Sequence, residues 1–167
     1  NNYQNPSTDP VEEPATEESV EEPVEETGTV YPQKWATGDG TAANPWTNDC
    51  INKAITNCPA GGTIFLKAGY YSSPLININK SLNLIGESRN KTIIVTSVTT
   101  TNAIYSEQDY VTLKGFSLDC SSQNDNYSGI NIQKADYWTM QDLEVINSGY
   151  YGINIREMNH SLFQNLY

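Results

Sequence analysis

Residues Val111-Thr112-Leu113-Lys114-Gly115 form a five-residue unit that occurs four times in the sequence. The other copies are 82–86 (Leu-Asn-Leu-Ile-Gly), 138–142 (Trp-Thr-Met-Gln-Asp) and 161–165 (Ser-Leu-Phe-Gln-Asn). The units begin 29, 27 and 23 residues apart (111 − 82, 138 − 111 and 161 − 138), and repeats of roughly 20 to 50 residues are typical of stacked coils. Positions one and three share one side of a strand, while Gly, Asp or Asn at position five tolerates a left-handed corner. The repeat therefore predicts a β-solenoid.

A second repeat supports the same register. Gly129-Ile130-Asn131-Ile132 returns as Gly152-Ile153-Asn154-Ile155, which is 23 residues later (152 − 129). We expect Asn131 and Asn154 to stack in adjacent coils as a structural ladder. Ile, Leu, Val, Phe and Met are expected to fill the lumen, with Leu113 and Leu143 among them.

The charge of the chain is unevenly distributed. Residues 1–28 contain nine carboxylates and no Lys or Arg, and the net charge of the whole chain is −11. The rest of the chain has 11 acids (20 − 9) against 9 bases, so it lacks the concentrated basic patch that nucleic-acid binding requires. Residues 1–30 are predicted to be an extended, acidic Pro/Glu-rich linker or tail. The alternative is a cation-binding or adhesive tail.

Residues 31–62 are predicted to form an N-terminal cap. It contains a short helix from about residue 48 to 57, capped by Thr47 or Asn48 and stopped at Pro59. The helix is expected to bury Ile51, Ala54 and Ile55 across the open end of the first coil. Residues 63–167 are predicted to be the coils. They end without a polar capping segment, so we expect the solenoid to be incomplete at the C-terminus and the chain to be the N-terminal part of a longer protein.

Three cysteines, Cys50, Cys58 and Cys120, cannot all pair within one chain. On one continuous helix Cys50 and Cys58 would be about 12 Å apart, which is beyond disulfide reach. They can form a bridge only if Cys58 has already left the helix before Pro59. The alternative is three buried thiols.

The opening of the folded part resembles a known family. The segments that carry the resemblance are Thr37-Gly38-Asp39-Gly40-Thr41, the expected helix, 59–66 (Pro-Ala-Gly-Gly-Thr-Ile-Phe-Leu) and 68–71 (Ala-Gly-Tyr-Tyr). They are similar to the start of right-handed parallel β-helix proteins of the pectate-lyase-like superfamily. The resemblance implies an all-β, right-handed parallel β-helix with a short N-terminal capping helix. It leaves the activity open, because that superfamily includes polysaccharide lyases, hydrolases, epimerases, phage tailspikes, adhesins and non-catalytic surface proteins.

The resemblance also implies what catalysis would require. Members that cleave acidic sugars use carboxylate-bound Ca²⁺ with a Lys or Arg base, and hydrolase members use carboxylate pairs. The candidate acids and bases are Asp119, Asp125, Asp136, Asp142, Glu144, Lys134 and Arg156. Asp142 aligns with the corner position of the repeat, and Asp136 aligns with Asp109 and Asn159 at a turn, so backbone geometry explains both.

Asp119 and Asp125 have no such explanation. Asp119 directly precedes a polar excursion, residues 120–128, and Asp125 lies within it; excursions on a solenoid often form a binding face. They are the candidate metal ligands, for Ca²⁺, with a solvated loop as the alternative. No complete catalytic constellation is visible, so we assign no catalytic residue, and whether the chain is an enzyme stays open.

Aromatic residues also occur at the predicted turns. Tyr127, Tyr150 and Tyr151 are candidates for stacking against the apolar faces of sugars, and packing between neighbouring turns is the alternative. His160 has no second His or Cys at metal-ligand spacing, so it is interpreted as a solvated or hydrogen-bonded side chain.

Four acceptor sequons for N-glycosylation fall at predicted turns or loops. Their asparagines are Asn79, Asn90, Asn126 and Asn159. Because the chain is rich in Asn, Ser and Thr, chance occurrence is the alternative. The pattern favours a surface location and carries no information about catalysis.

These features favour an extracellular or cell-surface protein that binds or processes polysaccharide along its lateral groove. Its expected partners are polysaccharides or surface glycans. The alternative is a non-catalytic structural glycoprotein, a surface-layer, filament or adhesin subunit, whose acidic tail docks on a neighbouring copy. No stretch approaches the roughly 18 apolar residues of a membrane span, so no membrane insertion is expected.

Overall fold

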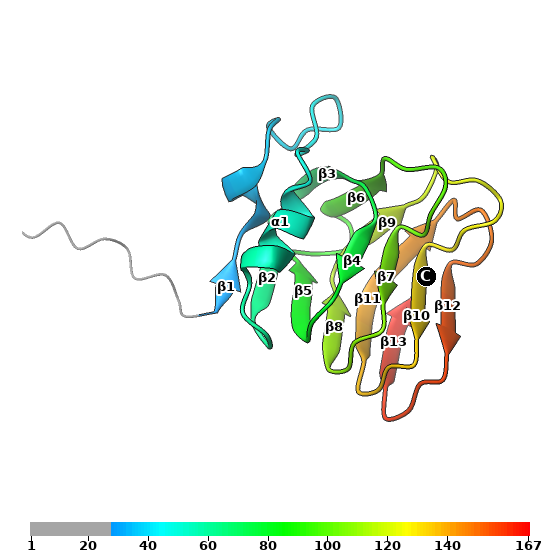
Figure 1. Cartoon of the computed structure of the whole chain (residues 1–167). Coiled ribbons are helices and arrows are strands. Elements are labelled where there is room, and N and C mark those ends of the chain that lie inside the picture. Colours follow the sequence, from blue (N-terminus) through cyan, green and yellow to red (C-terminus); the bar gives the residue numbers. More distant parts are fainter. Residues whose placement is uncertain (1–27) are drawn as a thin grey trace, which may run out of the picture.

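The computed structural model describes residues 28–167, and predictions for residues 1–27 lie outside this range (Figure 1). Its two helical elements are the 3₁₀ helix η1 (Pro32–Trp35) and the α-helix α1 (Cys50–Asn57). The strands are β1 (Thr29–Val30), β2 (Thr63–Leu66), β3 (Gly69–Ser73), β4 (Ile76–Ile78), β5 (Leu82–Gly86), β6 (Thr92–Thr96), β7 (Ile104–Ser106), β8 (Val111–Lys114), β9 (Ser117–Asp119), β10 (Ile130–Gln133), β11 (Thr139–Ile146), β12 (Ile153–Arg156) and β13 (Leu162–Leu166). No helix among the described residues is long and apolar enough to cross a membrane.

The strands stack into three parallel faces, which we name sheets A, B and C. Sheet A contains β1, β2, β5, β8, the first half of β11 and β13. Sheet B contains β3, β6, β9 and the second half of β11. Sheet C contains β4, β7, β10 and β12. Because the chain visits A, B and C in turn and every pairing is parallel, the predicted parallel β-helix is confirmed.

The lumen is filled in layers, as the repeat predicts. Leu113 is flanked by Leu84 of the preceding coil and Met140 of the following coil. All three side chains are fully buried, and Leu143 is buried as well. The two predicted lumen positions, Leu113 and Leu143, are therefore confirmed.

The corner between sheets A and B uses the fifth position of the repeat. Gly115, Asp142 and Asn165 have left-handed φ angles of 71°, 53° and 53°. The Asn165 Nδ2 donates to Asp142 Oδ1 over 2.7 Å, which links the corners of adjacent coils. Gly86 differs, because its φ is not left-handed. A Cβ there would lie 2.3 Å from the Gly115 carbonyl oxygen, so this glycine allows the two coils to approach closely.

The N-terminal helix forms, but its start was predicted wrongly. It begins at Cys50, and the residue before it, Asp49, has a left-handed φ of 53° and makes no side-chain capping bond. The predicted cap Asn48 instead donates from Nδ2 to the Trp35 carbonyl oxygen over 3.0 Å. The buried face is as predicted and also includes Cys50. It joins the core of the first coils, where α1 lies beside the N-terminal end of the solenoid in Figure 1.

The first strand lies inside the segment that was predicted to be a tail. Thr29 pairs with Thr63 and Val30 with Ile64, in parallel. The remaining part of the predicted tail, residues 1–27, is outside the described range.

All three cysteines are free and buried. Cys58 has left the helix, with an extended φ of −75° and ψ of 133°, yet it is not bonded to Cys50. Burial raises the pKa of Cys50 to about 11 and that of Cys120 to about 12. Buried thiols are the alternative that this structure supports.

We expect three reactive thiols per chain after denaturation and slow reaction in the native state, measured with a thiol-specific disulfide reagent. A Cys50–Cys58 disulfide would leave only one reactive thiol.

The buried thiols should also make the stability depend on pH. Because the unfolded thiols lose their protons near their ordinary pKa of 9.0 and the folded thiols keep theirs, the free energy of unfolding should fall as pH rises above about 9. A variant with Ala at both Cys50 and Cys120 should lose part of this pH dependence.

Candidate functional site

The outer face of sheet C presents an in-register column of polar side chains. Alternation in the short strands places isoleucines inward and the residues between them outward. The register aligns Asn77 with Tyr105, Tyr105 with Asn131, and Asn131 with Asn154. The stacking of Asn131 and Asn154 is thereby confirmed in the backbone register. At the N-terminal end of the column, the Asn77 backbone N–H donates to Asn52 Oδ1 of α1 over 3.1 Å.

A second outward row lies where these strands end. Gln133 pairs with Arg156 across β10 and β12, and Glu107 directly follows β7. The Tyr105 hydroxyl donates to Glu107 Oε1, and this bond raises the pKa of Tyr105. Arg156 is exposed and forms no ion pair within residues 28–167. The face therefore combines amides, a phenol and one charge of each sign.

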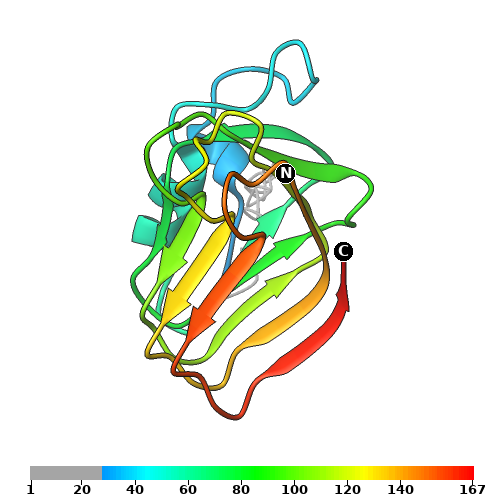
Figure 2. The same cartoon turned by 90° about the vertical axis from the view of Figure 1, so that its right-hand side faces the viewer.

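The three candidate tyrosines lie on two hydrogen-bonded loops, Tyr127 on the loop before β10 and Tyr150 and Tyr151 on the loop before β12. Figure 2 shows the strands of sheet C side by side. The Tyr150 N–H donates to the Tyr127 carbonyl oxygen over 3.0 Å, and the Gly129 N–H donates to the Tyr151 carbonyl oxygen over 2.9 Å. The rings of Tyr150 and Tyr151 have centroids 4.1 Å apart at an angle of 55°, and these side chains are 61% and 49% exposed. We name Tyr127, Tyr150 and Tyr151 the tyrosine turn.

The tyrosine turn feels the charge of Arg156, which belongs to sheet C. The Tyr151 hydroxyl lies 3.4 Å from that of Tyr150. This hydrogen bond raises the pKa of Tyr151, and the positive charge of Arg156 acts in the opposite direction. The Tyr151 hydroxyl is therefore neutral near pH 7.

The candidate metal ligands do not form a cluster. Asp119 Oδ1 accepts from the Ser121 N–H over 3.0 Å and from Asn147 Nδ2 over 2.9 Å, so this oxygen stabilises the turn. Asp125 is exposed within the loop 120–128 that directly follows Asp119. Within the described part of the chain, no group of three or more His, Cys, Asp or Glu side chains is placed to hold a metal ion. A Ca²⁺ site at Asp119 and Asp125 stays a prediction, and no chemical step is derived from it.

The other candidate acids have structural partners. Asp136 Oδ1 accepts from the Asn159 backbone N–H over 2.6 Å and from its Nδ2 over 3.1 Å, as its turn position predicts. Glu144 accepts from Ser117 Oγ over 2.8 Å and forms an ion pair with Arg89 at 3.5 Å. Both Ser117 and Glu144 belong to sheet B. Lys134, a candidate base, has a left-handed φ of 52° directly after β10.

The four sequon asparagines are all exposed. Asn159 is distinguished by its amide, which already donates to Asp136. Glycosylation of Asn79, Asn90, Asn126 and Asn159 stays a prediction.

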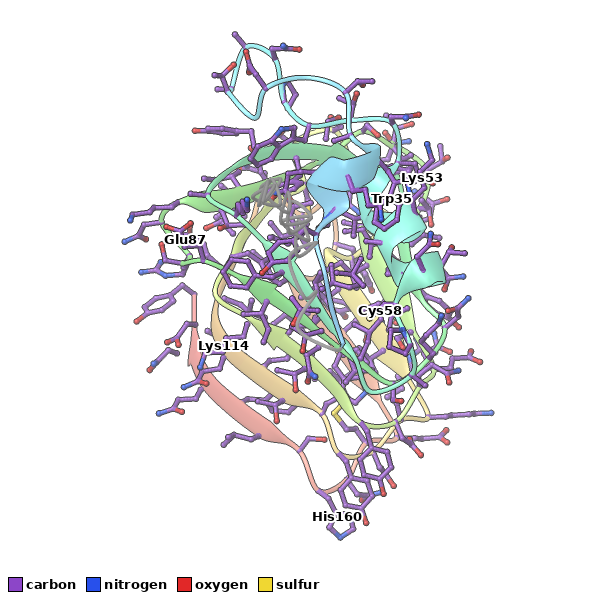
Figure 3. All side chains as sticks on the ribbon, turned by 90° about the vertical axis from the view of Figure 1, so that its left-hand side faces the viewer. Trp35, Lys53, Cys58, Glu87, Lys114 and His160 are labelled. Carbon is purple, nitrogen blue, oxygen red and sulfur yellow. The ribbon has the colours of Figure 1, made fainter. Side chains whose placement is uncertain are left out.

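Sequence reasoning missed a stack of three exposed aromatic rings. Tyr110 and Tyr137 have ring centroids 4.7 Å apart at 1°, and Tyr137 and His160 have centroids 4.9 Å apart at 13°. All three residues have left-handed φ angles, and His160 projects from the edge of the solenoid (Figure 3). The sequence contained a signal for this stack, because each of the three aromatic residues directly follows a residue of one aligned turn position, namely Asp109, Asp136 or Asn159. Tyr137 lies in the middle and has both of its faces covered by the other two rings, so only the two end rings keep a face that the stack does not cover.

A hollow of about 400 Å³ opens beside β12 and β13. Ile155, Met158 and Phe163 contribute to its lining, and Phe163 is 43% exposed. The strand residues that line this hollow are Ile155 and Phe163, which alternate toward the inner side of their sheets. Asn154 and Arg156 alternate toward the outer side of sheet C, so the hollow is separate from the polar outer face.

The three parallel sheets, the cap helix and the polar lateral face define a parallel β-helix protein with the pectate-lyase-like fold. The sequence matches no family model and no curated protein. Among solved structures, the chain is similar to the A-module of Azotobacter vinelandii mannuronan C-5 epimerase AlgE6, with a TM-score of 0.68 and 18% identity over 81% of this chain and 42% of that one.

Two further structures show the same fold. ORF18 of Geobacillus virus E2 has a TM-score of 0.59 and 20% identity, over 71% of this chain and 26% of that chain. A pectin methylesterase in complex with a hexasaccharide has a TM-score of 0.51 and 17% identity, over 62% of this chain and 40% of that chain. The chain thus spans less than half the length of each of these proteins.

Proposed function

We propose that this protein binds a polysaccharide along the outer face of sheet C, with the tyrosine turn at one end of the binding surface. The observation that carries the proposal is the in-register column Asn77, Tyr105, Asn131 and Asn154. Adjacent strands are about 4.8 Å apart, so the column repeats hydrogen-bonding groups along the solenoid axis. An extended polymer has the matching shape.

The chemistry of these side chains suits sugar hydroxyls. Each Asn amide offers two donors and an acceptor, and sugar hydroxyls are both donors and acceptors. Tyr150 and Tyr151 add large, exposed rings with a polar tip. The fold likeness to proteins whose names include mannuronan epimerase and pectin methylesterase supports the polysaccharide class.

The proposal concerns binding, and it assigns no catalytic residue. A glycosidase needs two carboxyl groups about 5 to 10 Å apart, and the assigned roles of Asp136 and Glu144 place them in a turn and on sheet B. An extracellular or cell-surface location belongs to the same proposal, because extended polysaccharides occur outside the cell.

The test is to measure polysaccharide affinity for Asn131→Ala and for the double variant Tyr150→Ala with Tyr151→Ala. Losing a central amide or two stacking rings removes about 1 to 3 kcal/mol, so the Kd should rise about tenfold or more. Gln141→Ala is the matched control, because Gln141 is an amide on the outer side of sheet A, bonded to Gln164 over 3.3 Å. Equal losses in all three variants, or a loss in the control alone, would contradict the proposal.

A further inference from the structure

The charges around the face of sheet C indicate which polysaccharide it accepts. The central column contains three amides and one phenol and no charged side chain. Such groups bind hydroxyls without requiring a charge on the ligand. A polymer with a carboxylate on every sugar would need a row of cations, and the column supplies none.

The two charged side chains of the second row have opposite signs. Arg156 ends β12 and Glu107 follows β7, and β10 lies between these strands. Two strand spacings separate them, which is about 10 Å. A polyanion lying along this row would gain one contact with Arg156 and meet the like charge of Glu107. Directly beyond the row, the exposed Lys134 and Glu157 follow β10 and β12 and again offer one charge of each sign.

The surroundings of the tyrosine turn add further negative charge. The loop that packs against Gly149 contains Asp125, and Asp119 lies at the beginning of the same loop. On the other side of the face, Lys80 is engaged with the helix, because its ammonium donates to the Cys58 carbonyl oxygen over 3.1 Å.

The whole chain disfavours polyanions as well. Its net charge is −11, and nine carboxylates without a Lys or Arg occur in residues 1–28. A field of this sign slows the approach of an acidic polymer, most strongly at low ionic strength.

From these observations we infer that the ligand of sheet C is an uncharged polysaccharide, with Glu107 acting against acidic polymers. This inference rests on the proposed function. It separates the protein from the epimerase and the methylesterase with which it shares its fold, since mannuronan and pectin are built on uronic acids.

The experiment measures the affinity of the full chain for uncharged polymers (galactomannan, arabinoxylan and a mixed-linkage β-glucan) and for acidic polymers (polygalacturonate and alginate). We expect at least one uncharged polymer to bind about tenfold more tightly than either acidic polymer, and its Kd to change less than about twofold between 0.02 and 0.5 M NaCl.

Two variants test the assignment of the charges. Glu107→Gln should strengthen polygalacturonate binding by about twofold or more at low salt, because it removes the like charge. Arg156→Gln keeps a hydrogen-bonding side chain on the face, so it should change the Kd of the uncharged ligand less than the Kd of polygalacturonate at low salt.

The results distinguish a wrong ligand charge from a wrong proposed function. Tighter, salt-sensitive and Arg156-dependent binding of an acidic polymer would overturn this inference and leave the proposed function standing. Absence of binding to every polymer in both sets would overturn the proposed function and the inference together.

Discussion

Leu113→Asp is expected to prevent the solenoid from folding. Leu113 is fully buried, with Leu84 and Met140 in the coils on either side. Removing the side chain alone, as in Leu113→Ala, should cost about 2 to 5 kcal/mol. An unpaired carboxylate in the same layer costs more, and a typical domain has only about 5 to 15 kcal/mol of stability. Circular dichroism and chemical denaturation of the purified chain would measure the loss.

Thr112→Asp is the matched control for this variant. Thr112 is the preceding residue on the same strand and points outward, where it lies between Asn83 and Thr139. It introduces the same charge at a partly exposed position, so its free energy of unfolding should change by less than about 1 kcal/mol. Loss of folding in Thr112→Asp with a stable Leu113→Asp would mean that the two faces of β8 are reversed.

The layers of the lumen could be predicted because each coil pairs with the next in parallel and in register. In that geometry a repeat in the sequence becomes a stack in space, so aligning Leu84, Leu113 and Met140 by their units also aligns them in the core. Asp142 and Asn165 were predictable at the corner for the same reason. A one-residue error would have moved the whole apolar set to the outside.

The start of the helix could not be predicted from local rules. Two consecutive residues, Asn48 and Asp49, adopt left-handed φ angles of 66° and 53°. Propensity alone favours an extended capping residue there. The Asn48 side chain instead bonds to the carbonyl oxygen of Trp35, 13 residues earlier in the chain, and rules based on neighbouring residues do not include such a partner.

The candidate face was only partly predictable. Asn131 and Asn154 were recognised as a pair because they belong to a four-residue repeat. Asn77 was missed, although Ile76-Asn77-Ile78 repeats the triplet of 130–132 and was a usable signal. Tyr105 carries a weaker signal, since Ile104-Tyr105-Ser106 keeps only the first isoleucine, and the register of β7 was needed to place it.

Gly149→Ala is expected to displace the tyrosine turn while leaving the coils folded. A Cβ at Gly149 would lie 1.9 Å from the Asn124 carbonyl oxygen and 2.9 Å from Asp125 Cα. These are backbone atoms of the loop 120–128, so a side-chain rotation cannot relieve the overlap and the loop must move. Because Tyr150 follows directly and bonds to the Tyr127 carbonyl oxygen, the turn should move with it.

The expected result is a loss of about 1 to 3 kcal/mol in the free energy of unfolding, faster proteolytic cleavage within residues 120–128, and about tenfold weaker polysaccharide binding. Proteolysis and hydrogen exchange report on the loop without requiring a ligand. They therefore test the packing separately from the function.

Gly152→Ala provides the control within the same segment. Neither glycine has a left-handed φ, so the comparison concerns space alone. The nearest atoms to a Cβ at Gly152 belong to Val145 and lie 3.9 Å away, an ordinary contact. This variant should keep the stability, the protease resistance and the affinity of the parent chain. If both variants behaved alike, the loop 120–128 would not pack on Gly149, and the tyrosine turn would lose its structural support as one end of the binding face.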